Sequence, residues 1–117
     1  MEDKTMASID ELKAQLEKLK LVPVVALPSV DAGLRLAELL LKHSLPVAEI
    51  TFRTSCAADG MAEIQKRYPE LLLLAGTVVT SEQVKLAIDS GAKGIVSPGF
   101  TAQMADYCSQ ASISYFP

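Results

Sequence analysis

The sequence predicts a parallel α/β fold, and two observations predict it. Short segments rich in β-branched and aliphatic residues recur about 19 to 25 residues apart, beginning near positions 22, 47, 71, 93 and 112. The segments between them repeat their apolar residues with the period of a helix and are bounded by capping residues, glycines and prolines. Strands and helices that alternate at this spacing are typical of βαβ units with parallel strands.

Two architectures fit this pattern. A doubly wound sheet of five strands would be complete in 117 residues, whereas an eight-stranded (β/α) barrel, or TIM barrel, normally needs about 250 residues. The segment 47–54 carries Glu49 and Arg53 on one face and apolar residues on the other. Central strands of a doubly wound sheet should be apolar on both faces, whereas a barrel has a polar mouth. The pattern therefore favours the barrel.

The first elements are predicted as follows. Residues 8–20 form a helix, since Ser8 and Glu11 match a capping box and leucines follow at helical spacing. A first strand spans 22–27, and a second helix spans 31–43 and ends before a proline. We expect residues 1–20 to be an N-terminal helical segment, and residues 21–117 to be part of one barrel domain that continues beyond the supplied chain.

Later elements carry similar signals. The second strand, 47–54, precedes a helix that a proline ends, and a leucine run forms the third strand. Thr80 and Gln83 form another capping box, whose helix ends at Gly91. Thr101 caps the last helix. The remaining predicted elements are a helix over 57–68, strands over 71–75 and 94–97, a helix over 102–109, and a strand over 113–116.

Composition bounds the function. The net charge is −3 and no basic run is present, so a nucleic-acid partner is not expected. No apolar run is long enough to span a membrane, and no signal-peptide pattern opens the chain. Cys56 and Cys108 are isolated, and no metal-ligand spacing surrounds His43. These features predict reduced thiols, a cytoplasmic protein and no metal site.

Polar and turn-forming residues fall where the predicted strands end, which is where barrels carry their active sites. Glu49 can transfer a proton, and Arg53 can bind a carboxylate or phosphate. Thr77 can donate a hydrogen bond from a loop whose Gly76 lets a ligand come close. Together they indicate an anionic substrate and proton-transfer chemistry. On spacing alone, an internal ion pair between Glu49 and Arg53 is an equal alternative. The strand-end residues are Pro28, Ser29, Glu49, Thr51, Arg53, Gly76, Thr77, Ser97, Pro98, Gly99, Phe116 and Pro117.

Four motifs, at 23–25, 48–54, 75–78 and 97–99, give the chain a family resemblance. They are similar in order and spacing to the motifs of the class I aldolases for 2-keto-3-deoxy-6-phosphogluconate, which also act on 4-hydroxy-2-oxoglutarate. The resemblance runs from about residue 22 to residue 117. It implies a homotrimeric (β/α) barrel whose substrate is a small keto acid with a pyruvate moiety.

The resemblance also implies roles for individual residues. Glu49 matches the general acid/base, Arg53 matches the residue that binds the substrate carboxylate, and Thr77 matches a contact to the same pyruvate moiety. Pro98 and Gly99 match a loop that lines the pocket. The implied reaction is retro-aldol cleavage to pyruvate and either glyceraldehyde 3-phosphate or glyoxylate. It proceeds through a lysine Schiff base, so neither a metal nor an organic cofactor is required.

One part of the family pattern is missing. The family's Schiff-base lysine lies on the sixth strand, and we expect this chain to stop after the fifth. Lys93 opens the predicted fourth strand and so lies at the wrong end of the barrel. The chain is therefore expected to be an N-terminal half that is inactive alone. The alternatives are another barrel aldolase or isomerase acting on a sugar acid, and a non-catalytic half-barrel module.

Overall fold

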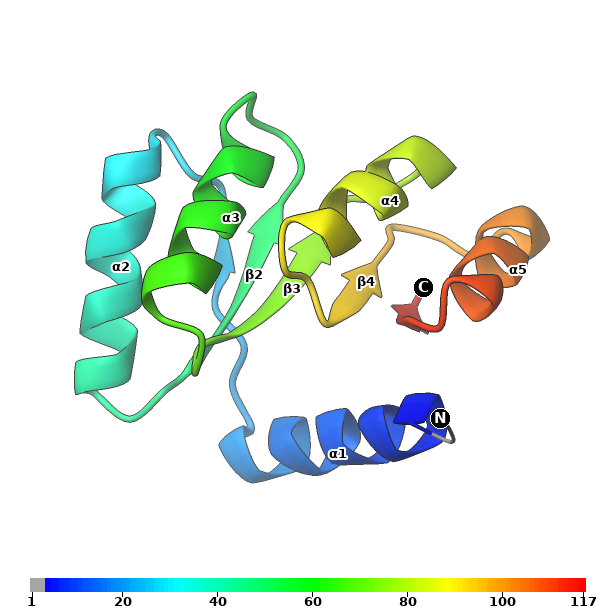
Figure 1. Ribbon diagram of the computed structural model, residues 1–117, viewed down its shortest axis with the longest axis horizontal. Helices are drawn as coiled ribbons and strands as arrows, with labels where there is room; N and C mark the ends of the chain where they lie inside the picture. The colour runs from blue at the N-terminus through cyan, green and yellow to red at the C-terminus, as the bar shows by residue number, and fades with distance from the viewer. Residues whose placement is uncertain (1–3) are drawn as a thin grey trace.

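The computed structural model describes the backbone of residues 4–117 and the side chains from residue 9 onward. Helices and strands alternate along the described chain (Figure 1). The helices are α1 (Lys4–Leu19), α2 (Val30–Lys42), α3 (Ala57–Arg67), α4 (Ser81–Asp89) and α5 (Ala102–Gln110). The strands are β1 (Val24–Val25), β2 (Val47–Thr51), β3 (Leu72–Gly76), β4 (Gly94–Val96) and β5 (Ser114–Phe116).

The five strands form one sheet in the order β1-β2-β3-β4-β5, and every neighbouring pair is parallel. A doubly wound sheet reverses its strand order at a switch point and carries helices on both faces. Here the order is strictly sequential, which is the order of barrel strands. The barrel interpretation is thus confirmed as a partial barrel, in which β1 and β5 are the edges of the described sheet.

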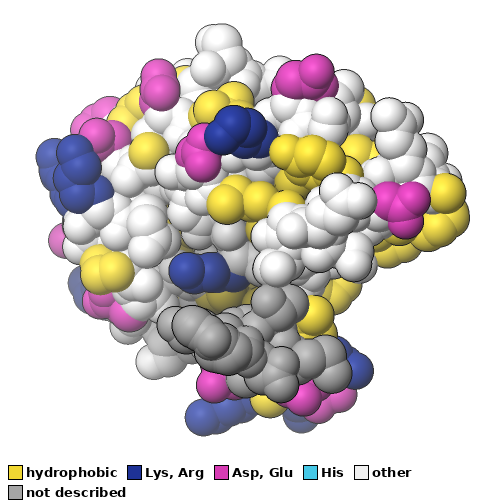
Figure 2. Space-filling model, turned by 45° about the vertical axis from the view of Figure 1, so that its right-hand side comes forward, with side chains coloured by type: hydrophobic (Ala, Val, Ile, Leu, Met, Phe, Trp, Pro, Cys, Tyr) yellow, Lys and Arg dark blue, Asp and Glu magenta, His cyan; other side chains and the backbone are white. Residues whose placement is uncertain are grey.

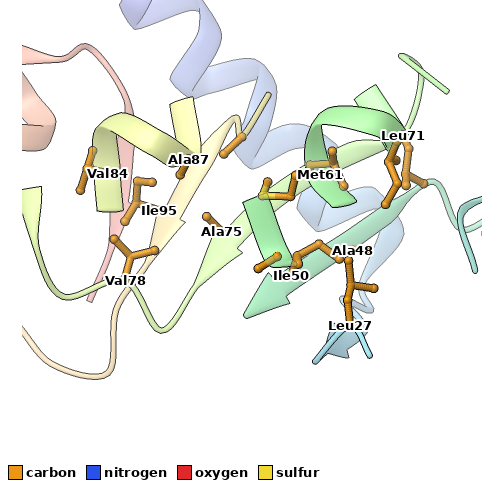
Figure 3. Close-up of a cluster of buried hydrophobic side chains, with 14 of the residues drawn as sticks. Leu27, Ala48, Ile50, Met61, Leu71, Ala75, Val78, Val84, Ala87 and Ile95 are labelled. Carbon is orange, nitrogen blue, oxygen red and sulfur yellow. The ribbon is translucent and has the colours of Figure 1, made fainter. Parts of the chain in front are cut away.

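One face of the sheet packs against α2, α3, α4 and α5. Figure 3 shows this core, with Ala48 and Ile50 of β2 near Met61 of α3, and Ile95 of β4 near Val84 of α4. Side chains alternate in direction along a strand, so these residues define the helix-covered face. In a barrel this is the outer face.

The opposite, inner face contacts α1 where the strands begin. Leu12 of α1 packs with Val47 of β2 and with Leu72 and Leu74 of β3. Gly94 makes room for this cluster, because an added Cβ would lie 2.9 Å from Cδ2 of Leu74. In Figure 1, α1 lies below the sheet, at the end from which the strand arrows start. This cluster thus lies on the inner face, with α1 toward the strand starts.

The predicted helix signals at three caps are confirmed. Thr80 accepts a hydrogen bond from the Gln83 amide, and the Gln83 side chain accepts one from the Thr80 amide, which completes the capping box. Thr101 accepts from the Met104 amide at the start of α5. Gly91 follows α4 with φ of 109°, the conformation that favours glycine.

Three predicted boundaries are wrong. Helix α1 already begins at Lys4, so Ser8 lies inside it and is not its N-cap; residues 1–3 lie outside the described residues. The first strand is only Val24–Val25, and Pro23 before it has no amide to donate to the ladder. The second strand ends at Thr51, and Arg53 lies in the turn that follows.

The molecular surface carries charges of both signs. Figure 2 shows Lys and Arg side chains separated from one another and mixed with Asp and Glu on the face in view. None of the described helices has the length and hydrophobicity needed to cross a membrane. Both cysteines are free thiols. Cys108 is fully buried in the outer core, and this burial raises the pKa of its thiol.

Candidate active site

The structure places the predicted site residues within or just after three adjacent strands. Glu49 lies within β2, and Arg53 follows the same strand. Thr77 comes directly after β3, and Pro98 and Gly99 follow β4 in an exposed loop. Because the strands are parallel and adjacent, their carboxyl ends lie along one edge of the sheet. This is the edge at which barrel enzymes carry their active sites.

Glu49 lies half-buried on the inner face, with its carboxyl group over Gly76 of the neighbouring strand. An added Cβ on Gly76 would lie 2.8 Å from Cδ and 2.9 Å from Cγ of Glu49. The glycine therefore makes the space that the carboxylate occupies. Sequence reasoning assigned Gly76 to close approach by a ligand, whereas in the structure it admits the acid/base candidate itself.

The surroundings of Glu49 favour its protonated form. Burial raises the pKa of the Glu49 carboxyl above its ordinary value of 4.5, and the positive charge of Arg53 opposes part of that rise. A carboxyl group whose pKa moves toward neutrality both accepts and donates protons more readily at physiological pH. The electrostatics are therefore those expected of a general acid/base.

The raised pKa of Glu49 predicts a pH-dependent stability difference. The Glu49 carboxyl has a higher pKa in the folded protein than in the unfolded chain, where it is near 4.5. Its contribution to the free energy of unfolding is therefore fully present below pH 4.5 and is lost as the pH rises through the folded-state pKa. We expect Glu49→Gln to unfold at higher denaturant concentration than wild type at neutral pH, with a smaller difference at pH 4. Urea titrations at both pH values test this. Glu17→Gln, at an exposed position on α1, is the control, and an equal gain there would contradict the prediction.

Arg53 contacts Thr77 across the strand ends. Its Nε donates a hydrogen bond to Oγ1 of Thr77 at 3.4 Å, and its side chain is otherwise exposed at the mouth of the site. This contact orients the guanidinium and leaves its other nitrogens free of described partners. A guanidinium held in this way can bind a carboxylate through two parallel hydrogen bonds.

Thr77 adopts an unusual backbone conformation. Its φ is 57°, in the left-handed region that β-branched residues rarely occupy. The neighbouring backbone holds it there: the Gly76 carbonyl accepts from the Phe52 amide at 2.8 Å, and the Val78 amide donates to the Val96 carbonyl at 3.2 Å. Strained residues of this kind gather at ligand-binding sites. The conformation directs the Thr77 hydroxyl to Arg53.

Two expectations for this strand need correction. Thr51 does not line the site, because it is 4% exposed and its hydroxyl donates to the Val25 carbonyl at 3.3 Å. It joins β2 to β1 instead. The alternative of an internal ion pair also fails, since no described salt bridge joins Glu49 to Arg53. Arg53 acts on Glu49 through its charge alone.

The Gly76 contact predicts a strong effect of a small substitution. In Gly76→Ala the new methyl group would overlap the carboxylate and Cγ of Glu49, so the Glu49 side chain must move. A displacement of about 1 Å in a catalytic group can cost about 100-fold in rate. We expect such a loss in the whole enzyme, measured as kcat, with a stability within about 1 kcal/mol of wild type. Gly99→Ala, whose methyl group meets no atom within 4 Å, is the matched control for stability.

The loop after β4 contains a contact that sequence reasoning missed. Pro98 and Gly99 are exposed, and no described contact joins them to Glu49, Arg53 or Thr77. The hydroxyl of Tyr115 on β5 donates to the Gly99 carbonyl at 3.2 Å. An aromatic residue in a predicted strand is expected to pack in the hydrophobic core. Nothing in the sequence pattern could therefore have indicated this hydrogen bond to the loop.

The lysines lie away from this edge of the sheet. Lys93 directly precedes β4 and its side chain is exposed at the opposite end of the strands, as predicted. The others lie on helices or just after α1, at positions 4, 13, 18, 20, 42, 66 and 85. No described lysine follows a strand end, and no described group of three or more His, Cys, Asp or Glu side chains could hold a metal ion.

Comparison with known sequences identifies the family of this chain. A family model described as KDPG and KHG aldolase matches residues 12–117. A 2-dehydro-3-deoxy-phosphogluconate aldolase of Haemophilus influenzae is 44% identical over 103 residues, which cover 88% of this chain and 49% of the relative. The KHG/KDPG aldolase of Escherichia coli K12 is 31% identical over 82% of this chain and 45% of its own length. The chain thus spans about half the length of the curated relatives that it matches.

Solved structures give the same result for the fold. The KDPG aldolase of Legionella pneumophila, described with pyruvate captured as a covalent carbinolamine intermediate, superimposes with a TM-score of 0.78 at 30% identity. The match covers 82% of this chain and 47% of that one. The aldolase of Zymomonas mobilis with 3-phosphoglycerate gives a TM-score of 0.76, also at 30% identity, and is covered to 46%.

Proposed function

Because this chain belongs to the family of KDPG and KHG aldolases, we propose that the whole protein is a class I aldolase that releases pyruvate from a keto acid. The observation that supports the proposal most strongly is the arrangement of Glu49 beside the strand ends at which Arg53 contacts Thr77. This arrangement brings a carboxyl group of raised pKa, a guanidinium and a hydroxyl to one edge of the sheet.

In the proposed reaction, Arg53 binds the carboxylate of the pyruvate moiety, and Thr77 holds the guanidinium in position and contacts the same moiety. The charge-assisted hydrogen bonds between Arg53 and the carboxylate hold the neighbouring C2 carbonyl of the substrate in one position for attack. Pro98 and Gly99 line the pocket from the loop after β4. These roles follow the family resemblance, and the positions of the residues at one edge of the sheet support them.

Glu49 is proposed to transfer protons at three points. A lysine amine adds to the C2 carbonyl, and Glu49 protonates the resulting alkoxide to give the carbinolamine, then takes up the proton that the added nitrogen loses. Glu49 donates this proton to the departing hydroxyl, which leaves as water to form the Schiff base and returns Glu49 to its carboxylate form. It next removes the proton of the C4 hydroxyl. The C3–C4 bond breaks, its electrons enter the Schiff base as an enamine, and the aldehyde leaves. Protonation of the enamine and hydrolysis then release pyruvate.

The lysine nucleophile is proposed to lie outside this chain, on a sixth strand beside β5. The described lysines do not support another assignment, since Lys93 is at the opposite end of the sheet. The 117-residue chain alone is therefore proposed to be inactive. The substrates are proposed to be 2-keto-3-deoxy-6-phosphogluconate, 4-hydroxy-2-oxoglutarate or both, and the whole protein is proposed to act as a cytoplasmic homotrimer.

The proposal is tested by turnover. The whole protein is incubated with each of the two substrates, and pyruvate is measured by a coupled dehydrogenase assay. We expect pyruvate release from at least one of them. A panel of unphosphorylated 2-keto-3-deoxy sugar acids identifies a barrel aldolase of different specificity. Absence of pyruvate from every substrate would overturn the proposed function.

A further inference from the structure

Tyr115 lies on β5, on the side of the sheet that faces the helices. It pairs in register with Ile95 of β4, which is buried in the outer core. Residues paired in adjacent parallel strands point to the same face. The Tyr115 ring therefore packs outside the barrel interior and does not face the substrate edge of Glu49 and Arg53. Any effect of Tyr115 on the reaction must pass through another group.

The phenol of Tyr115 joins β5 to the β4–α5 loop by three contacts. Its hydroxyl donates to the Gly99 carbonyl at 3.2 Å and accepts from the Thr101 amide at 3.4 Å. Its ring lies 6.2 Å from the ring of Phe100, centroid to centroid, with an interplanar angle of 42°. Tilted aromatic pairs at this separation attract one another. One side chain thus contacts three consecutive loop residues.

These contacts lie between two other sets of hydrogen bonds that hold the start and the end of the loop. At its start, the Ser97 amide donates to the Phe116 carbonyl at 3.0 Å and ends the ladder between β4 and β5. At its end, Thr101 caps α5. For residues 98–100 between them, the only described backbone hydrogen bond is the one from Tyr115 to Gly99. The Phe100 side chain is 64% exposed, so core packing does not hold this segment.

We propose that Tyr115 is a positioning residue that fixes the β4–α5 loop in its substrate-lining conformation. The proposal rests on the proposed function, because it takes Pro98 and Gly99 as part of the pocket. A loop held at a strand end by hydrogen bonds pays less ordering entropy when a ligand binds. Tyr115 does not touch the substrate, so its removal should weaken binding while the chemical step continues.

The first test compares two phenylalanine variants of the whole enzyme. Tyr115→Phe removes both hydrogen bonds and keeps the ring beside Phe100. Tyr107→Phe on α5 is the matched control, since Tyr107 is also half-buried against the outer core and its hydroxyl has no described partner. We expect Tyr115→Phe to raise KM about three- to tenfold with kcat changed less than about twofold, as the loss of one or two modest hydrogen bonds implies. An unchanged KM, equal to that of Tyr107→Phe, would overturn the positioning role.

The second test reads the contact without any substrate. Hydrogen exchange of the Thr101 amide should accelerate in Tyr115→Phe, because its acceptor is removed. The Met104 amide, which donates to the Thr101 side chain, is the internal control and should be unchanged. Equal exchange rates of the Thr101 amide in the wild type and in Tyr115→Phe would refute its hydrogen bond to the Tyr115 hydroxyl. Because this measurement needs no turnover, it separates failure of the Tyr115 proposal from failure of the proposed aldolase activity.

Discussion

Glu49→Gln in the whole enzyme is expected to reduce kcat about 10²- to 10⁴-fold, the range for loss of a general acid/base. The substitution keeps the shape of the side chain and its position over Gly76, but the amide cannot accept a proton from the C4 hydroxyl. Because Glu49 is expected to act mainly in the transition state, KM should change little. Steady-state kinetics of pyruvate release measure both quantities.

The control for this prediction separates chemistry from folding. Glu49→Gln should fold normally, and the raised pKa of Glu49 implies greater stability of the variant at neutral pH. A thermal melt at pH 7 therefore accompanies the kinetics. Retention of more than about a tenth of the wild-type kcat in a folded variant would contradict the assignment of Glu49 as the acid/base.

Arg53→Ala is expected to raise KM at least about ten- to 150-fold, because the loss of even one hydrogen bond to a charged group costs about 1.5–3 kcal/mol. The substitution should also raise the pKa of Glu49 further, because it removes the positive charge that opposes the effect of burial in the wild-type protein. The pH dependence of kcat/KM should therefore shift to higher pH. Arg53→Lys should recover the pKa effect but not the binding, because an ammonium cannot form the paired contact.

The control for Arg53 is another exposed arginine. Arg35 on α2 forms a surface ion pair with Asp31 at 3.6 Å, far in sequence from the site residues, and pairs of this kind contribute little to stability. Arg35→Ala should leave KM and the pH profile unchanged. If Arg53→Ala behaves as Arg35→Ala does, Arg53 does not bind the substrate carboxylate.

The sequence predicted the element order well, because most of its signals act locally. Capping by Thr80 and Thr101 and the glycine after α4 depend on neighbours within a few residues, and all are confirmed. The capping box at Ser8 failed because helix formation continues N-terminally to Lys4, and one matching pair of residues does not stop a helix. The ends of the strands were harder to predict, because they depend on hydrogen bonds to the neighbouring strand, which is distant in the sequence.

The site could be predicted only in part. Parallel strands at a fixed spacing place Glu49, Thr77 and Gly99 at adjacent strand ends, which sequence alone could indicate. The separate roles of Thr51, which bonds to β1, and of Gly76, which accommodates Glu49, depend on contacts between residues 25 or more positions apart. Alternation along a strand gives the face of a side chain but not its partner.

Borohydride trapping of the whole protein with pyruvate, followed by mapping of the labelled lysine, tests whether the reaction passes through a Schiff base. We expect one covalent adduct on a lysine beyond residue 117, at the end of a strand next to β5, and a much weaker yield with Arg53→Ala. The isolated chain should give none. An adduct on a lysine within this chain, or no adduct on the whole protein, would contradict the proposed Schiff-base mechanism.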